Sequence, residues 1–260
     1  MIEPTDYGDV RGFRLSWWRS RPIGFGVHVY VMRGVLIDTG FRGARDDLAS
    51  IVASEPLRGA FVTHQHEDHA GNVAWLAARG VPIAIDPHTL RVLQSPSRIG
   101  LYRRVTWQSA PAVTTPITPF RDEAMSLVHT PGHSPDHHAV WDRETGTLFA
   151  GDLFLGVKVR VAHGDEDPRA MVESLRAMIA RAPERVFCAH RGLLPGGTQL
   201  LAAKADWLEA TIDHVERLAR AGAGVAHIRA QVLGARGLHH WISFGEYSPN
   251  HWVRAVLRER

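Results

Sequence analysis

Short apolar runs alternate with helical patterns along the first 190 residues of the chain. Two apolar runs, Val27–Met32 and Val35–Asp38, flank the two-residue turn Arg33-Gly34 and predict a β-hairpin. Ala44–Ser54 has apolar residues at helical spacing and predicts a helix. Further strands are expected at 60–63, 82–85, 125–129, 138–141, 147–150 and 186–189, and further helices at 70–79, 87–93 and 168–181. This alternation predicts an α/β fold.

Two stretches depart from this alternation. Residues 95–123 are rich in Pro, Ser and Thr and predict an irregular insertion, of the kind that often covers a site in compact enzymes. After Gly197 the apolar residues keep helical spacing without any strand pattern, which predicts helices at 200–221, 225–233 and 251–257. We therefore expect a main domain over residues 1–197 and a helical C-terminal extension over residues 198–260 that packs on it.

The composition bounds the class of protein. The 260 residues are 45% hydrophobic and 22% charged, as in a globular protein of one or two domains. The single cysteine, Cys188, excludes an intramolecular disulfide and a cysteine-rich zinc module, and it favours a reducing compartment. No apolar run approaches the roughly 18 to 20 residues that span a membrane, and the N-terminal segment lacks the apolar core of a secretory signal. We therefore expect a cytoplasmic protein without a membrane partner.

Charge and histidine content point to different chemistries. A net charge of +3 over 260 residues is not the footprint of a dedicated nucleic-acid binder, so nucleic acid is not the expected partner. The 16 histidines are the compositional outlier, and histidine is the commonest metal ligand.

A cluster of possible metal ligands follows the strand expected at 60–63. His64 and His66 are two residues apart and point the same way if the strand period persists, whereas Asp68 and His69 fall on the turn that follows. One zinc ion cannot take all four and stay open for catalysis, but two metals can share them. The alternative is a solvated histidine-rich loop, or a helix start capped by Asp68.

The run His64-x-His66-x-Asp68-His69 resembles the signature of the metallo-β-lactamase superfamily. Segments matching further family motifs follow in order, namely Thr130–Ser134, Ala150–Asp152 and Cys188–His190. The resemblance covers about residues 25 to 195. It implies one metal held by His64, His66 and His133, a second held by Asp68, His69 and His190, and Asp152 between the two. Asp38 corresponds to an early family aspartate that supports the ligand loop.

The same resemblance, to the glyoxalase II-like metallo-hydrolase branch, implies fold and activity. The expected fold is an αββα sandwich of two mixed β-sheets flanked by helices, with the metals at one edge. Two divalent ions, zinc in the first place with iron or manganese as alternatives, would activate water for attack on an ester, thioester or lactone. Asp68 would orient that water or take a proton. A β-lactamase is less expected, because an export signal is not seen.

Three cationic residues are candidates for contact with a small, anionic substrate. Many family members have His-Gly after the last ligand, whereas here His190 is followed by Arg191, which could pair with an anionic group or lie on the surface. Lys158 and Arg160 would share one face of a strand after Asp152, or form an exposed basic edge.

Two other activities remain open at this stage. One is a nuclease acting on RNA or another phosphodiester, because the helical C-terminus is similar to a segment appended in some nuclease-like members. The other is a mononuclear iron dioxygenase acting on a persulfide, which would use two histidines and an aspartate of the same set. A diiron flavoprotein is disfavoured, since His66 replaces the expected Glu. The sequence leaves the substrate, the metal and the oligomeric state undetermined.

Overall fold

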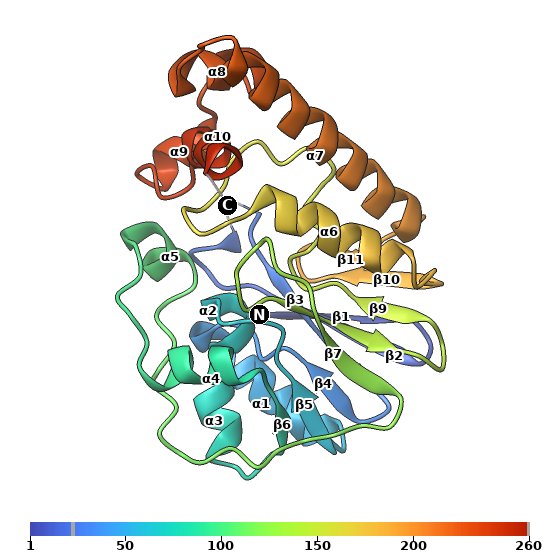
Figure 1. The fold of residues 1–260 in the computed structure, drawn as a ribbon. Coiled ribbons are helices and arrows are strands. Elements are labelled where there is room, and N and C mark those ends of the chain that lie inside the picture. The colour runs from blue at the N-terminus through green and yellow to red at the C-terminus, as the bar shows by residue number, and fades with distance from the viewer. Residues whose placement is uncertain (22–23, 259–260) are drawn as a thin grey trace.

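Two mixed β-sheets lie face to face at the centre of the molecule, and helices cover the outer side of each (Figure 1). The computed structural model describes residues 1–21 and 24–258, apart from the side chain of His239. The arrangement confirms the αββα sandwich expected from the resemblance. Glu259 and Arg260, at the end of the expected extension, lie outside the described residues.

The first sheet has the strand order β1-β2-β3-β4-β5-β6. Strands β1 to β4 pair antiparallel, and β4, β5 and β6 pair parallel. The β3–β4 hairpin is confirmed, and its turn has φ of 50° at Arg33 and 73° at Gly34, as a tight turn between twisted strands requires. The strands are β1 (Ile2–Asp6), β2 (Val10–Leu15), β3 (Val27–Met32), β4 (Val35–Ile37), β5 (Gly59–Phe61) and β6 (Ile83–Ala84).

The second sheet has the order β11-β10-β9-β8-β7, in which only β9 and β10 pair parallel. Helix α6 (Pro168–Ile179) connects these two parallel strands, as a crossover must. The strands are β7 (Met125–His129), β8 (His138–Asp142), β9 (Thr147–Phe149), β10 (Arg185–Cys188) and β11 (Gly192–Leu193).

Apolar side chains fill three layers. The layer between the sheets contains Tyr30 and Phe61 from the first sheet and Phe149 and Phe187 from the second. The outer face of the first sheet is covered by η2 (Arg42–Ala44), α1 (Arg45–Ser54), α2 (Glu67–Ala70), α3 (Val73–Ala77) and α4 (Pro87–Gln94). These layers hold the strand ends in fixed positions, which is what a site built at the strand ends needs.

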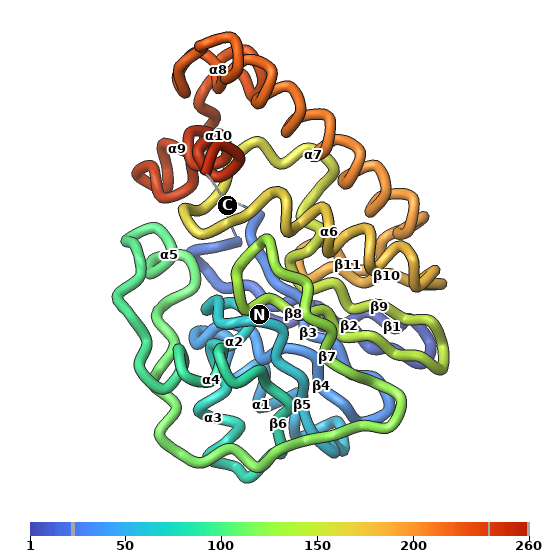
Figure 2. Tube along the Cα trace, viewed as in Figure 1, coloured from blue at the N-terminus to red at the C-terminus, as the bar shows by residue number. Residues whose placement is uncertain are grey.

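The C-terminal helices complete the cover of the second sheet. Helix α7 (Gly197–Arg220) runs along α6, and α10 (Pro249–Leu257) packs near both (Figures 1 and 2). Leu201, Leu208 and Trp252 are buried in the same cluster as Leu175 of α6. The other two helices are α8 (Val225–Val232) and α9 (Leu238–Ile242). The extension therefore shares one hydrophobic core with the second sheet.

The prediction of one continuous helix over 70–79 is wrong, because α2 ends at Ala70 and α3 begins at Val73. Gly71 lies so close to neighbouring backbone that a Cβ would stand 2.4 Å from the carbonyl oxygen of Glu67. The Asn72 amide donates hydrogen bonds of 2.9 Å to the carbonyl oxygens of Thr39 and Phe41. Contacts between distant segments therefore interrupt the helix.

Other elements lie where no regular structure was predicted. The insertion over 95–123 contains helix α5 (Leu101–Thr106), so it is not wholly irregular. Strands β1 and β2 were not predicted, because β1 is mostly exposed and β2 interrupts its apolar positions with Arg and Gly. Helix α9 and the two-residue strand β11 were also not predicted.

Within the described residues, the helices are too short or too polar to cross a bilayer.

Candidate metal centre

The histidines and carboxylates expected as ligands converge at one edge of the sandwich. His64 and His66 follow β5, and Asp68 and His69 lie in α2. The other three come from the β7–β8 loop, the end of β9 and the β10–β11 turn: His133, Asp152 and His190. The parallel strands β5, β9 and β10 thus all deliver residues at their carboxyl ends, where α/β proteins build their sites.

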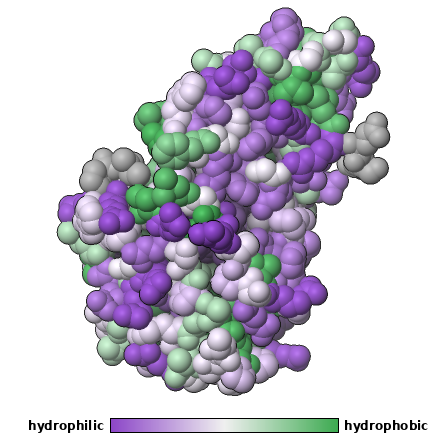
Figure 3. All heavy atoms as spheres, turned by 90° about the vertical axis from the view of Figure 1, so that its left-hand side faces the viewer, coloured by the Kyte–Doolittle hydropathy of each residue, from purple (hydrophilic) through white to green (hydrophobic). Residues whose placement is uncertain are grey.

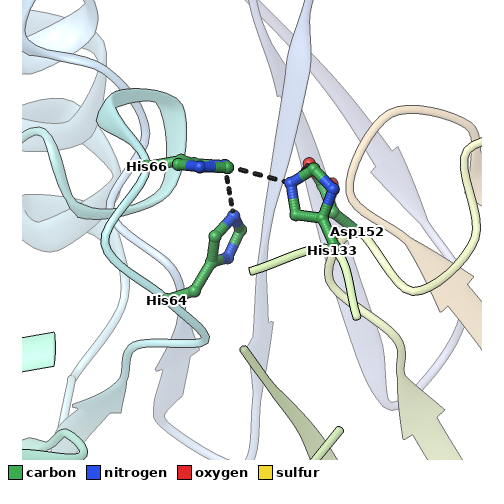
Figure 4. A group of neighbouring side chains, drawn as sticks. All are labelled: His64, His66, His133 and Asp152. Carbon is green, nitrogen blue, oxygen red and sulfur yellow. Dashed lines mark hydrogen bonds and ion pairs between the residues drawn. The ribbon is translucent and has the colours of Figure 1, made fainter. Parts of the chain in front are cut away.

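The first group contains His64, His66, His133 and Asp152, all of them buried (Figure 4). His66 Nδ1 lies 3.0 Å from His64 Nε2 and 3.0 Å from His133 Nε2. Asp152 Oδ2 lies 3.2 Å from His133 Nε2. One ligand atom of each residue lies within 4.8 Å of the others, so four potential ligand atoms face a common point.

The second group contains Asp68, His69 and His190. Asp68 Oδ2 lies 3.4 Å from His190 Nε2 and 3.7 Å from His69 Nε2. Asp152 also reaches this group, because its Oδ1 lies 3.2 Å from His190 Nε2 and 3.4 Å from His69 Nε2. Asp152 therefore presents Oδ2 to the first group and Oδ1 to the second.

These residues fit two divalent cations. Within the described residues, the buried atoms His69 Nε2 and Asp152 Oδ1 have no hydrogen-bond partner. An unpaired buried polar atom costs about 1–3 kcal/mol, so such atoms in a native protein call for a ligand or an ion. Imidazole and carboxylate without thiolate suit zinc, iron or manganese.

Residues behind the ligands fix the orientation of their rings. Asp38 Oδ2 accepts a hydrogen bond from His69 Nδ1 at 2.7 Å, and the same carboxylate accepts bonds from the backbone N and Oγ1 of Thr63. His190 Nδ1 lies 2.9 Å from the carbonyl oxygen of Gly26. Such contacts select the tautomer and turn the other ring nitrogen toward the metal. Asp38 therefore occupies the supporting position expected from the sequence.

His137 supports the centre from a position that the sequence did not assign. The backbone N–H of Asp152 donates to His137 Nε2 at 3.0 Å, and His137 Nδ1 lies 2.9 Å from Thr130 Oγ1. The ring of His138 lies on the other face of β8, with its centroid 4.9 Å from that of His129. Adjacent residues of an extended segment point to opposite sides, which is why only one of these two histidines reaches the site.

Burial and charge act differently on the two groups. Burial lowers the pKa of His64 and His66 well below the usual value, and that of His133 to about 3. Burial also opposes the charged form of His190, but Asp152 and Asp68 outweigh it and raise its pKa to about 9. The first group therefore offers neutral imidazole nitrogens, the form that binds metal, while negative charge is concentrated around the second.

A buried ion pair ties the ligand loop to the insertion. Arg103 of α5 donates from Nε and Nη2 to the carboxylate of Glu67, at 3.1 and 2.9 Å. Burial raises the pKa of Glu67 more than Arg103 lowers it. Nothing in the local pattern around Arg103 indicates this contact, because the two residues are 36 positions apart.

A buried lysine supports the turn that carries Asp152. Lys204 of α7 donates from Nζ to the carbonyl oxygen of Leu153 at 2.7 Å. Lys204 and the buried Glu166 line a small cavity whose wall includes His133. Burial lowers the pKa of Lys204 to about 8 and raises that of Glu166 to about 7. Neither residue was singled out from the sequence, because the helical pattern of α7 does not reveal that one polar position faces inward.

The three cationic candidates for substrate contact lie at or near the surface. Lys158 and Arg160 are exposed in the irregular segment between β9 and α6, so the prediction that they share a strand face is wrong. Arg191 donates from Nε to the carbonyl oxygen of Leu155 at 2.7 Å. Of the three, Arg191 is the one adjacent to a candidate ligand in sequence.

Fold and site together define an αββα protein with a metal centre of histidines and carboxylates. A model of the metallo-beta-lactamase superfamily matches residues 23–190. The chain therefore belongs to this superfamily, as its motifs indicated.

Curated relatives cover part of the chain. A hydroxyacylglutathione hydrolase of Shewanella oneidensis is 35% identical over 137 residues, which are 52% of this chain and 48% of that protein. An atrochrysone carboxyl ACP thioesterase of Aspergillus aculeatus is 28% identical over 192 residues, which are 70% of this chain and 53% of that protein. The chain thus spans about half the length of these curated relatives.

Solved structures share the fold at low sequence identity. A metallo-beta-lactamase family protein of Thermus thermophilus is 17% identical, with a TM-score of 0.68, and the match covers 96% of this chain and 92% of that one. A metallo-beta-lactamase of Pontibacter korlensis is 19% identical, with a TM-score of 0.61, over 80% of this chain and 99% of that one.

Proposed function

We propose that the chain is a metal-dependent hydrolase that uses two divalent ions, zinc in the first place, to cleave an ester, thioester or lactone. The observation that carries this proposal is the position of Asp152, which turns one carboxylate oxygen toward each of two ligand groups. A centre for one ion would not use the second group of potential ligands, Asp68, His69 and His190.

In the proposed centre, His64, His66 and His133 hold one ion, Asp68, His69 and His190 hold the other, and Asp152 lies between them. Bound divalent ions would lower the pKa of water and withdraw charge from a carbonyl group. Asp68 is the proposed catalytic residue. Its carboxylate belongs to the second group, from which it can orient water and accept a proton.

The substrate is proposed to be a small molecule, with a thioester first among the three bond types. Relatives named hydroxyacylglutathione hydrolase and ACP thioesterase support the thioester. Arg191 is proposed to pair with an anionic group of the substrate, since it follows His190 and stays exposed. Lys158 and Arg160 are proposed to make weaker contacts with the substrate at the surface.

We also propose the division into a catalytic domain over 1–197 and a helical extension over 198–260.

The first test is the metal content of protein purified without chelator. About two zinc ions per chain support the proposal, and turnover of thioesters, lactones and phosphodiesters is then compared. About one iron per chain contradicts it and favours the persulfide dioxygenase. Protein that binds no metal even after reconstitution also contradicts it.

Variants then connect the metal to the reaction. His64→Ala and Asp152→Ala should each lose metal and turnover, with neither restored by added zinc. His88→Ala is the matched control, because His88 is exposed in α4, away from both groups. Full activity in either ligand variant would contradict the proposal.

A further inference from the structure

Exposed apolar side chains gather around the approach to the metal centre. They lie on three segments: residues 17–21 between β2 and β3, helix α5, and residues 238–247 including α9. Figure 3 views this side of the molecule and shows hydrophobic patches among hydrophilic residues. We call the set the mouth face, and its members are 43% to 79% exposed: Trp18, Leu101, Val105, Leu238, Trp241 and Phe244.

Contacts between the three segments make the mouth face one surface. The indole Nε1 of Trp17 donates to the carbonyl oxygen of Thr106, at the end of α5, at 2.7 Å. The ring of Tyr102, in the first turn of α5, lies 6.0 Å from that of Tyr247. Helix α5 therefore joins the N-terminal loop to the segment that follows α9.

Helix α5 and the residue after it lie close to the metal centre. The ring of Trp107, which directly follows α5, lies 6.2 Å from that of His190. Burial and the charge of Asp68 raise the pKa of Tyr102 to about 12, and the same two causes act on Tyr247. Helix α5 and the residues beside it therefore lie next to the metal centre, on the same side of the molecule as the mouth face.

The exposed charged side chains of the mouth face are all positive. Its segments and the residues just before α5 and α9 carry five exposed arginines, and in the described part of the chain none of them lies within ion-pair distance of a carboxylate: Arg19, Arg21, Arg98, Arg104 and Arg236. The only acidic residue of these segments is Glu246, which is 16% exposed and lies 3.9 Å from Arg103 and 3.8 Å from His163. The face therefore combines apolar bulk with uncompensated positive charge.

We propose that the mouth face docks on the surface of an anionic lipid bilayer. Its bulky side chains enter the boundary between headgroups and acyl chains, and its arginines attract the negative headgroups. The two tryptophans suit this depth, because indole is enriched at membrane interfaces. A second copy of this chain docking through the same face would bring like charges together and leave the five arginines unpaired, whereas an anionic bilayer can pair them all. Docking of this kind needs no membrane-spanning helix and is independent of the proposed hydrolysis.

The test is co-sedimentation of the full chain with phosphatidylcholine vesicles, with and without phosphatidylglycerol. We expect binding only to the anionic vesicles, weakening as salt is raised. The double variants Trp241→Ser with Phe244→Ser, and Arg98→Ser with Arg104→Ser, should each weaken binding about tenfold or more. Because these side chains are exposed, the variants should keep the parent melting temperature.

Arg121→Ser with Arg143→Ser is the matched control, since it removes the same charge from exposed positions beside β7 and β8. It should change vesicle binding by less than about twofold, because salt screens charges that lie far from the bilayer. Absence of binding to anionic vesicles would overturn the proposal. So would a concentration-dependent dimer that is lost in the Trp241 and Phe244 double variant, because a second copy would then cover the face.

Discussion

Asp38 and His69 lie 2.7 Å apart, carboxylate Oδ2 to imidazole Nδ1, and both are buried. Asp38 also accepts the N–H and the hydroxyl of Thr63, which directly precedes the ligand run. One carboxylate thus orients a proposed ligand and holds the start of the loop that carries the others.

Asp38→Asn should weaken zinc binding at the second group about 10- to 100-fold, because an amide holds the Nδ1–H of His69 less strongly. Competition with a chromophoric chelator measures this effect. Asp213→Asn, which alters an exposed carboxylate of α7, is the control and should bind zinc as the parent does. Equal affinities in the two variants would exclude an orienting role for Asp38.

Lys204→Met should loosen the turn that carries Asp152, since the hydrogen bond to Leu153 is lost. We expect zinc affinity to fall several-fold, whereas the unfolding free energy of the metal-free protein changes by less than about 2 kcal/mol, because a costly buried ammonium is also removed. Lys158→Met is the control, since Lys158 is the other lysine of the chain and is exposed. Unchanged zinc affinity in Lys204→Met would count against this role.

Arg103→Ala should destabilise the protein by about 3–5 kcal/mol, because it leaves the buried carboxylate of Glu67 without its partner. Thermal or denaturant unfolding measures the loss. Arg104→Ala, the next residue of α5 and exposed, should cost less than about 0.5 kcal/mol. Similar losses in both would show that the helix itself, and not the ion pair, supports the loop.

Glu166 should make stability depend on pH. Burial raises its pKa from 4.5 to about 7, so the folded protein holds the proton more tightly than the unfolded chain. Its contribution is complete below about pH 4.5 and is lost as the pH rises toward about 7, with an upper limit of about 3 kcal/mol. Glu166→Gln should flatten the stability difference between pH 5 and 7 relative to the parent. Parallel curves for the two proteins would show that Glu166 does not titrate in this range.

His64, His66, Asp68 and His69 could be singled out as candidate ligands because they form one short run in the sequence. His133, Asp152 and His190 were expected only from the resemblance to the superfamily, and each follows a strand that apolar runs predict. The tight turn at Arg33 and Gly34 was predictable for the same reason, since two neighbouring residues determine it.

The supporting contacts of Arg103 and Lys204 could not be predicted, because they join distant segments. Glu67 and Arg103 are 36 residues apart, and Leu153 and Lys204 are 51 apart. Only glycine fits at position 71, because a Cβ there would stand 2.7 Å from the backbone of Phe41 and of Arg42. Such contacts depend on how the layers pack, and no periodicity in the sequence encodes them.

The hydrophobic cluster that α6, α7 and α10 share with the second sheet has a consequence for unfolding. Leu175, Leu201 and Trp252 are buried in one hydrophobic cluster with residues of β9 and β10. The C-terminal helices therefore cannot detach without exposing the core under these two strands. The chain should therefore melt in a single cooperative transition that takes the metal centre and the helical cover together.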